Sequence, residues 1–343
     1  MTVLDSSRWH RIDRALERLL DGKHVDLEAF PPEDRALLDQ LLRSARGDLP
    51  GLDTPAVTHQ ALGAALADML AEQDGIDADA RVGPFRIVEQ IGAGGMGIVY
   101  LARRVDGGFE QRVALKVLAD AAPDDAALRL FERERQLLAR LEHPGIARLI
   151  DGGVTASGRP WFAMEYIDGE PLIDYVEKRA LGITGRIHLF LQACDALDHA
   201  HRQLILHRDI KPGNLLVTSD GVLKLVDFGL GALLRTERAG QHTDTTLAAG
   251  RMTPGYASPE QARGEPVGVA SDVFQLGLVL YRLISGCRPY RVDGLSAYQI
   301  ALAVSDPSIR PPGARWREPD AGQRAIAFGE PAARLYRRLA GDL

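Results

Sequence analysis

The stretch Gly92-Ala-Gly94-Gly-Met-Gly97-Ile98-Val-Tyr-Leu-Ala102 decides the fold class, because three spaced glycines lead directly into an apolar run. A dinucleotide-binding fold has the same glycine spacing, but there a helix begins at the third glycine. Here the run Ile98–Ala102 is β-branched and aromatic, which is typical of a strand. The glycines therefore predict a hairpin between two strands, whose backbone can approach phosphates closely. A plain glycine turn without a ligand is the alternative that this stretch alone leaves open.

Further strands and helices surround this hairpin in a fixed order. Apolar runs predict strands over Phe85–Ile91 and Val113–Leu118. A helix is predicted over Ala126–Leu141, and later helices over Gly185–His201 and Ser271–Ser285. A β-rich piece thus precedes an α-rich piece, which predicts an α+β fold.

Length and composition exclude several classes of protein. With 343 residues, 45% of them hydrophobic and 26% charged, the chain has room for about two domains and is neither disordered nor fibrous. Its net charge of −6 gives no basic footprint for nucleic acid. The apolar stretch Phe274–Ile284 is too short to span a bilayer, and the N-terminus lacks the apolar core of a signal peptide. We therefore expect a cytoplasmic protein with no nucleic-acid partner and no membrane segment.

Residues 1–73 are predicted to form a small helical region of their own. Trp9, Ile12, Leu16 and Leu19 recur at helical spacing, and no catalytic constellation accompanies them. Such apolar stripes usually serve packing or docking. We expect a docking or regulatory region, binding a partner or the chain itself, followed by a linker over residues 74–81.

Motifs with charged and amide side chains follow the hairpin. Lys116 stands within the apolar strand Val113–Leu118, where a buried ammonium needs an anion such as a phosphate. Glu134, on the next predicted helix, can hold Lys116 in place. The motifs that follow are His207-Arg-Asp209-Ile-Lys211-Pro-Gly-Asn214, Asp227-Phe-Gly229 and Ala257-Ser-Pro-Glu260.

In identity and order, these motifs resemble those of eukaryotic-type (Hanks-type) bacterial Ser/Thr protein kinases. The resemblance implies a bilobal α+β fold, with a β-rich small lobe over residues 82–167 and an α-rich large lobe over residues 168–343. It also implies transfer of the γ-phosphoryl group of Mg-ATP to Ser/Thr hydroxyls of protein substrates. The alternative is a pseudokinase-like nucleotide-binding scaffold. Pseudokinases commonly lose residues that here are intact, namely Lys116, Asp209 and Asp227.

The resemblance also implies a role for each motif residue. Asp209 orients the substrate hydroxyl and accepts its proton, and Lys211 contacts the γ-phosphate. Lys116 contacts the α- and β-phosphates and pairs with Glu134. The other ATP-binding residues belong to the glycine hairpin, the apolar sandwich around adenine and the hinge: Ile91, Gly92, Gly94, Gly97, Val99, Ala114, Met164, Glu165, Ile167 and Leu216.

Metal-binding and regulatory residues are implied in the same way. Asn214 and Asp227 hold Mg²⁺, for which Mn²⁺ can substitute. Arg208 resembles the arginine that accepts an activation-loop phosphate, and we expect autophosphorylation in that loop. Thr253 resembles the threonine that bonds the catalytic loop, although Met252 replaces the usual glycine before it. The candidate phosphorylation sites are Thr243, Thr245 and Thr246.

Two packing features complete the resemblance. Asp272 resembles the buried carboxylate that anchors the catalytic-loop backbone, with a plain helix N-cap as the alternative. Four residues resemble the stack that links the two lobes, and they are Leu138, Leu149, His207 and Phe228.

We expect the C-terminal end of the large lobe to be incomplete. In the family, the glutamate that matches Glu260 pairs with an arginine on a late helix. Arg310 comes too early for this role, directly after the predicted helix Leu295–Val304. The ending Arg334–Leu343 resembles the start of the next family helix. The alternative is that another arginine substitutes, with Arg334, Arg337 and Arg338 as candidates.

Overall fold

The computed structural model describes residues 30–31, 35, 76–94, 97–106, 110–118, 125–228, 254–290, 303–304 and 309–340. The chain divides into two units, residues 1–70 and 71–343, and the elements described below belong to the second. Of the predicted N-terminal helices only single positions are described, such as Arg35, whose N–H donates to the Pro31 carbonyl at 3.0 Å. Several predicted residues lie outside the described ones: Gly229, Thr243, Thr245, Thr246, Met252, Thr253 and most of Leu295–Val304.

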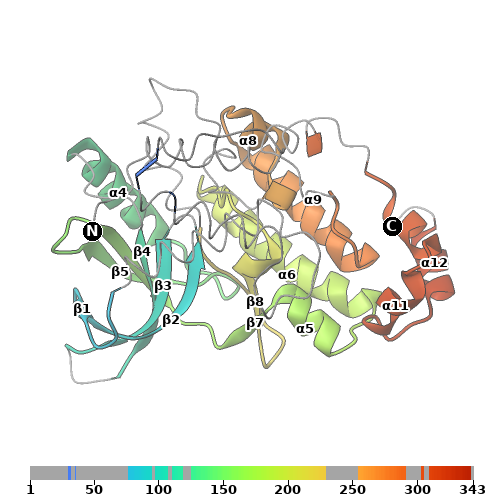
Figure 1. Cartoon of the computed structure of the whole chain (residues 1–343), viewed down its shortest axis with the longest axis horizontal. Coiled ribbons are helices and arrows are strands. Elements are labelled where there is room, and N and C mark those ends of the chain that lie inside the picture. The colour runs from blue at the N-terminus through green and yellow to red at the C-terminus, as the bar shows by residue number, and fades with distance from the viewer. Residues whose placement is uncertain are drawn as a thin grey trace. The chain divides into compact units, whose positions relative to one another are not determined.

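The small lobe is built on one antiparallel sheet, in which the strands follow the order β1-β2-β3-β4-β6-β5 (Figure 1). Helix α4 (Asp125–Leu138) connects β4 to β5. The strands predicted on either side of the glycine hairpin are confirmed, and β2 and β3 run up to the turn itself. The strand bounds are β1 (Arg81–Val82), β2 (Phe85–Gly94), β3 (Gly97–Arg104), β4 (Arg112–Leu118), β5 (Leu149–Val154) and β6 (Pro160–Glu165).

Side chains of β4 alternate between the two faces of this sheet. Val113, Leu115 and Val117 are 0% exposed and pack into a core that also contains Phe85. Lys116 lies between them in sequence and therefore projects from the opposite face. The strand that fills the small-lobe core thus presents its lysine on the face that meets the catalytic residues.

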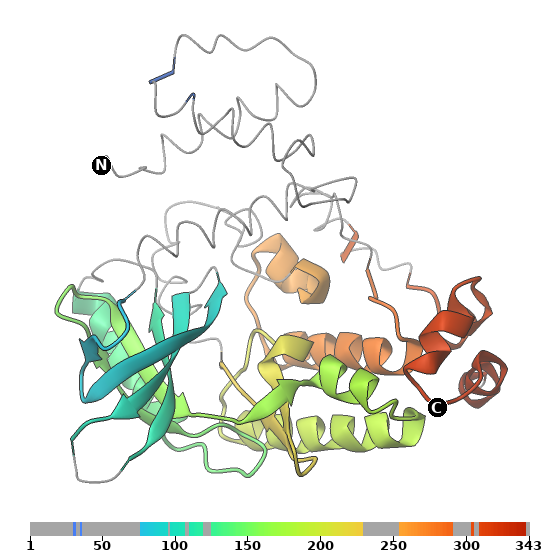
Figure 2. The same ribbon diagram turned by 60° about the horizontal axis from the view of Figure 1, so that its bottom comes forward.

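The large lobe is mainly helical, which confirms the predicted bilobal α+β fold. Helices α6 (Ile183–Arg202) and α9 (Val269–Ser285) lie side by side (Figure 2). Leu197 and Val279 of these helices share one core cluster with Phe162 of β6, so this core continues into the small lobe. The other described elements that precede the end of α9 include two helices, α5 (Leu172–Lys178) and α8 (Pro259–Arg263), and the 3-10 helices η2 (Pro212–Asn214) and η4 (Pro254–Tyr256). A second sheet consists of β7 (Gly169–Pro171), β8 (Leu215–Thr218) and β9 (Leu223–Leu225).

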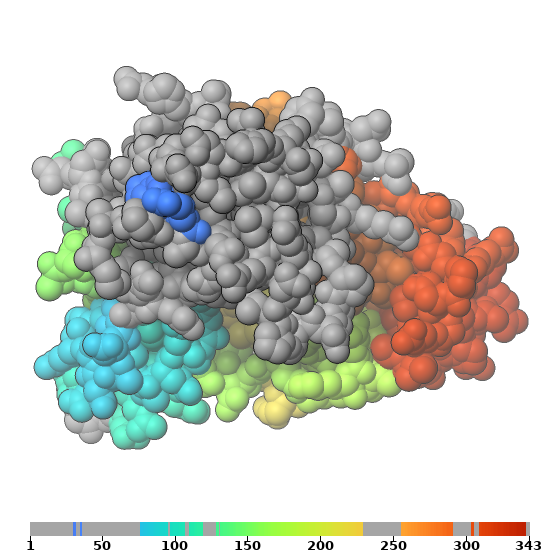
Figure 3. Space-filling view, in the orientation of Figure 1, coloured from blue at the N-terminus to red at the C-terminus, as the bar shows by residue number. Residues whose placement is uncertain are grey.

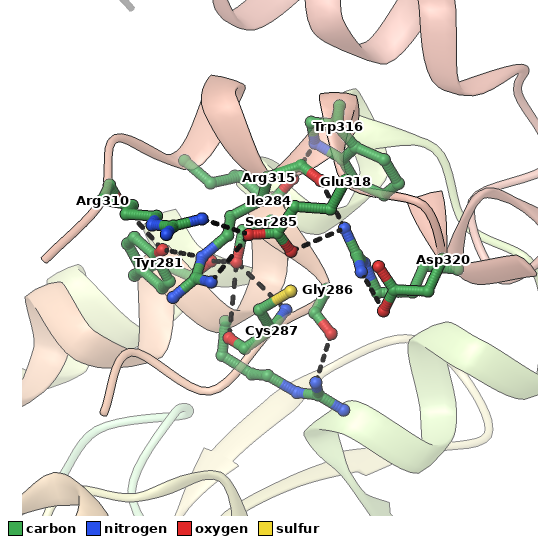
Figure 4. A network of polar contacts seen from close by, with 12 residues as sticks. Tyr281, Ile284, Ser285, Gly286, Cys287, Arg310, Arg315, Trp316, Glu318 and Asp320 are labelled. Carbon is green, nitrogen blue, oxygen red and sulfur yellow. Dashed lines mark hydrogen bonds and ion pairs between the residues drawn. The ribbon is translucent and has the colours of Figure 1, made fainter. Parts of the chain in front are cut away.

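Within the described range 309–340, three short helices follow: η5 (Pro312–Arg317), α11 (Ala321–Ile326) and α12 (Ala332–Leu339). They lie at the end of the unit opposite to β1, β2 and β3 (Figures 1 and 3). A polar network joins η5 to the end of α9 (Figure 4). Arg315 donates to the Tyr281 hydroxyl at 2.8 Å and to Glu318 at 2.9 Å, and the Trp316 indole donates to the Ile284 carbonyl at 3.1 Å. These bonds fix the C-terminal helices on the large lobe.

Among the described residues, Glu260 pairs with none of the arginines proposed for it. Arg338 instead donates to Glu330 at 2.8 Å, because α12 packs Leu335 into a cluster with Trp316 and turns Arg338 toward that carboxylate. The Oε2 atom of Glu260 is buried without a hydrogen-bond partner. The alternative, in which Arg334, Arg337 or Arg338 substitutes as the partner of Glu260, is therefore not formed.

Candidate active site

The glycine hairpin combines one sterically required glycine with an open backbone. Gly94 pairs with Gly97, and Gly92 pairs with Val99. Gly97 has φ +139°, and a Cβ there would lie 2.1 Å from the Val117 carbonyl oxygen, so no other residue fits. A Cβ on Gly94 would meet nothing within 4 Å. The space above Gly94 therefore leaves the backbone accessible to a ligand.

Lys116 is buried at 2% exposure and contacts the carboxylate of Asp227. The expected ion pair between Lys116 and Glu134 is not formed in this structure. Asp227 has a left-handed backbone, φ 59°, and its carboxylate supplies the anion that the buried ammonium needs. Glu134 is 8% exposed, and its Oε2 has no hydrogen-bond partner. Burial raises the pKa of Glu134 to about 8, and the charge of Arg208 opposes this shift.

The residues predicted to surround adenine lie on neighbouring strands and on the hinge. Ala114 of β4 is opposite Met164 of β6, and Val99 of β3 is opposite Lys116. Ile91 on β2 is 45% exposed, whereas Ile167 after β6 is 8% exposed. The last predicted member, Leu216, lies on β8 in the large lobe. The sheet register thus brings Val99, Ala114 and Met164 to the same face of the sheet as Lys116.

The hinge residue Glu165 is tied to both lobes. Its carboxylate accepts from the Lys224 ammonium at 2.8 Å and from the Arg148 N–H at 3.2 Å. Lys224 belongs to β9 of the large lobe, and sequence reasoning missed it. A cavity of about 520 Å³ lies beside this point, lined by Glu165, Tyr166 and Arg112 among others. Of the predicted nucleotide-binding residues, only Glu165 lines it, so this cavity is not the predicted nucleotide site.

The catalytic loop gathers its polar side chains around Asp209, which is 8% exposed. The Lys211 ammonium donates to the Asp209 carboxylate at 2.8 Å, and the Asn214 amide donates to the same carboxylate at 3.1 Å and to the Asp209 carbonyl at 2.8 Å. The structure therefore brings these three predicted residues together. The Val226 N–H donates to the Asn214 carbonyl at 3.0 Å, which brings the residue before Asp227 to this loop.

A divalent cation fits the donor atoms at this place. Asn214 uses its amide nitrogen toward Asp209, which leaves the amide oxygen as a ligand. Asp227 contributes a carboxylate, and oxygen donors of this kind suit Mg²⁺, which commonly takes one or two protein ligands beside phosphates and water. Within the described part of the chain, no group of three His, Cys, Asp or Glu side chains forms a closed metal site.

Asp272 anchors the catalytic loop, as predicted. Its carboxylate accepts from the His207 N–H at 2.8 Å and from the Arg208 N–H at 2.7 Å, and the His201 ring lies 2.8 Å away. The alternative of a helix N-cap is wrong, because Gly268 occupies the N-cap of α9. Asp272 is 0% exposed, so removing it would leave two backbone donors without an acceptor.

The four residues of the predicted stack are in place. The His207 and Phe228 rings lie 4.6 Å apart, centroid to centroid. Leu138 and Phe228 belong to one core cluster, against which Leu149 packs. Burial lowers the pKa of His207, so the ring is a neutral member of this core.

Two buried glutamines contact the catalytic loop, and sequence reasoning missed both. Gln275 accepts from the Ile210 N–H at 2.9 Å, and Gln261 donates to the Arg208 carbonyl at 2.6 Å. Gln275 follows Asp272 by three residues on α9, a spacing that places both on one helix face. That spacing was the available signal for Gln275. Gln261 carries a weaker signal, as the fourth residue of a capping box that starts at Ser258.

Residues 85–311 match the family model of the protein kinase domain, and the chain therefore belongs to the protein kinase family. The probable serine/threonine-protein kinase PknB of Bifidobacterium longum is 36% identical over 244 residues, which cover 67% of this chain and 35% of that protein. The serine/threonine-protein kinase PknB of Mycobacterium tuberculosis is 37% identical over 236 residues, covering 67% of this chain and 37% of that protein. The chain thus spans about a third of the length of these curated relatives.

Solved structures agree on the fold. The crystal structure of the Mycobacterium tuberculosis PknI kinase domain superposes with a TM-score of 0.51 at 26% sequence identity, covering 78% of this chain and 99% of that chain. Among the helices that the structure describes, none has the length and apolar character needed to cross a membrane.

Proposed function

We propose that this chain is a Ser/Thr protein kinase, which transfers the γ-phosphoryl group of ATP to a hydroxyl of a protein substrate. The observation that carries the proposal is the arrangement around Asp209. Its carboxylate is held by Lys211 and Asn214 in one loop, while the buried Lys116 of the small lobe reaches Asp227 in the large lobe. Acid, amide and ammonium groups are thus grouped in the pattern that phosphoryl transfer requires.

Each side chain has a task that its position supports. Asp209 accepts a hydrogen bond from the substrate hydroxyl and takes its proton as the oxygen attacks. Lys211, 2.8 Å from Asp209, stabilises negative charge that develops beside that carboxylate. Lys116 is buried and therefore interacts strongly with an anion placed near it. The bound nucleotide supplies the phosphoryl group, and its metal ion neutralises phosphate charge.

Nucleotide binding follows from the hairpin, the sheet and the hinge. Gly94 leaves room for phosphates above the backbone. The apolar faces of Ile91, Val99, Ala114, Met164, Ile167 and Leu216 would enclose adenine. Asn214 and Asp227 would hold Mg²⁺, with Mn²⁺ able to substitute. Glu134 would take part once it meets Lys116.

Regulation and location complete the proposal. Autophosphorylation at Thr243, Thr245 or Thr246 would add negative charge that pairs with Arg208. Thr253 would contact the catalytic loop. Residues 1–73 would serve as a docking or regulatory region, and the enzyme would act in the cytoplasm.

The test is incubation of the chain with labelled ATP and Mg²⁺, with Asp209→Asn as the matched variant. We expect labelled protein substrate and labelled chain for the wild type, and loss of both for the variant. Mass spectrometry then identifies the phosphorylated residues. Nucleotide binding without transfer by the wild type would replace the proposal with the pseudokinase alternative.

A further inference from the structure

Two amide side chains close a ring of hydrogen bonds around Asp209. The Ile210 N–H donates to Gln275 Oε1 at 2.9 Å, and Gln275 Nε2 donates to Gln261 Oε1 at 2.8 Å. Gln261 Nε2 then donates to the Arg208 carbonyl at 2.6 Å. The ring therefore starts at the peptide unit after Asp209 and ends at the peptide unit before it.

The direction of this ring is fixed at every bond. Ile210 offers a donor and Arg208 offers an acceptor, so each amide must present oxygen on one side and nitrogen on the other. Turning the Gln275 amide over would break two contacts, and turning the Gln261 amide over would also break its bond from the Ser258 N–H. Hydrogen bonds that run in one direction also polarise and strengthen one another. Only a residue with both a donor and an acceptor can serve at these positions.

Both amides are buried, which makes them costly to leave unpaired. Gln275 is 1% exposed and Gln261 is 6% exposed. Arg208, between them, has φ 67°, a left-handed backbone that is unfavourable for a residue with a Cβ. A strained backbone persists only where its surroundings hold it. The ring, together with Asp272 on the His207 and Arg208 N–H groups, supplies that hold.

Gln261 connects this ring to helix α8. Its Oε1 also accepts from the Ser258 N–H at 3.0 Å, and its own N–H donates to Ser258 Oγ at 3.3 Å, which forms the capping box of α8. The same side chain thus caps α8 and holds the peptide unit before Asp209. The Gln261 side chain therefore contributes both to the folding of α8 and to the position of the catalytic-loop backbone.

We propose that Gln261 and Gln275 are positioning residues for phosphoryl transfer: they fix both peptide units that flank Asp209 and make its carboxylate direction depend on a folded α8. This inference rests on the proposed function, because Asp209 is the group being positioned. The hydrogen bonds of the two glutamines described above go to Ile210, Arg208 and Ser258, none of which is assigned to the nucleotide. We therefore expect them to affect the chemical step and to leave ATP binding intact.

The test compares Gln275→Met and Gln261→Met with the control Gln192→Met in the full chain. Gln192 is chemically matched, because it also bridges two backbone groups, accepting from the Leu223 N–H at 2.9 Å and donating to the Gly221 carbonyl at 3.3 Å. Those groups belong to the β8–β9 turn and the start of β9, and not to the catalytic loop. Methionine keeps the side-chain length and removes both hydrogen-bonding atoms.

For both ring variants we expect kcat to fall between about tenfold and a hundredfold, with the KM for ATP within about twofold of wild type. The double variant should lose little more than the worse single variant, because one ring is broken in each case. Gln192→Met should lower the melting temperature and leave kcat unchanged. If Gln275→Met and Gln261→Met behave like Gln192→Met, losing stability but not kcat, the positioning role is refuted.

Amide hydrogen exchange at Ile210 separates this inference from the proposed function. Gln275→Met should speed that exchange by about tenfold or more, since the acceptor is lost, and Gln192→Met should not change it. If the wild type transfers no phosphoryl group, the proposed function fails, and the exchange rates alone then decide whether the two amides hold the loop. Unchanged exchange at Ile210 in Gln275→Met would overturn the ring itself.

Discussion

Two glycines of the hairpin should respond in opposite ways to the same substitution. Gly97 combines φ +139° with a neighbour, the Val117 carbonyl oxygen, that would lie 2.1 Å from an added Cβ. A residue held in such a backbone region costs about 1–3 kcal/mol, and overpacking against a fixed backbone costs about as much again. Gly97→Ala should therefore lower the free energy of unfolding by about 2–5 kcal/mol. For a domain of this size that corresponds to a fall of roughly 5–15 °C in melting temperature.

Gly94 offers the matched control. An added Cβ meets nothing within 4 Å there, and its φ is not in the left-handed region. Gly94→Ala should keep or slightly raise stability, because a glycine replaced without strain loses less entropy on folding. Its methyl group would stand in the space proposed for phosphates, so the KM for ATP should rise about tenfold.

Thermal unfolding of both variants, with and without Mg-ATP, checks this pair of expectations. Gly97→Ala should unfold at a clearly lower temperature in the absence of nucleotide. Gly94→Ala should match the wild type without nucleotide and gain less from Mg-ATP, since ligand binding to the folded state raises the melting temperature. Equal melting temperatures for the two variants without nucleotide would refute the steric argument for Gly97.

Three further predictions concern stability. Because burial raises the pKa of Glu134 to about 8, the folded chain retains a proton that the unfolded chain releases above pH 4.5, and the free energy of unfolding falls as pH rises between these two values. The melting temperature of Glu134→Gln, relative to that of the wild type, should therefore rise between about pH 5 and pH 9. A difference that stays constant over this range would contradict the raised pKa. Leu204 is 92% exposed at φ 61°, so Leu204→Asn should add about 0.5–1 kcal/mol in urea unfolding, and a loss would show that the leucine has a partner. Arg86 stands directly opposite Arg81 on one side and Arg103 on the other, so Arg86→Thr should raise the melting temperature by about 1–3 °C at low salt, an effect that should fade as salt rises.

Features of the site could be predicted from the sequence where a motif determines both the residue type and the local backbone conformation. Lys211 and Asn214, which were predicted to meet the γ-phosphate and Mg²⁺, are found on the Asp209 carboxylate. The strands around the hairpin and the anchoring by Asp272 were predicted and are found. Each of these depends on residues close in sequence or on one buried carboxylate. Such local and strongly charged features leave a clear signal.

Long-range partners were harder to predict. The motif names Lys116, Glu134 and Asp227, but which carboxylate the ammonium meets depends on the backbone of Asp227 and on the placement of α4, which no local pattern encodes. Gln275 and Lys224 were missed for another reason. An amide inside a helix, or a lysine on a short strand, is common on surfaces, and only the fold shows that these two reach the catalytic loop and the hinge.

The hydrogen bonds of the site divide it into a part that is held firmly and a part that can adapt. Around Asp209 the flanking backbone groups have side-chain partners from three elements: Asp272 and Gln275 of α9, Gln261 of α8, and Asn214 of η2. A shift of the loop would break several of these bonds together, so the loop is over-determined.

Two acidic side chains are less well satisfied. Glu134 on α4 and Glu260 on α8 each have a buried oxygen without a hydrogen-bond partner, although hydrogen bonds with its own backbone, Ser258 and Ser271 lower the pKa of Glu260. An unpaired buried oxygen costs about 1–3 kcal/mol, which a new donor would recover. A donor brought to Glu134 would therefore recover this cost, whereas a shift of Asp209 would break several hydrogen bonds. A shift of α4 that brings Glu134 to the Lys116 ammonium would remove one of these costs while Asp209 stays in place.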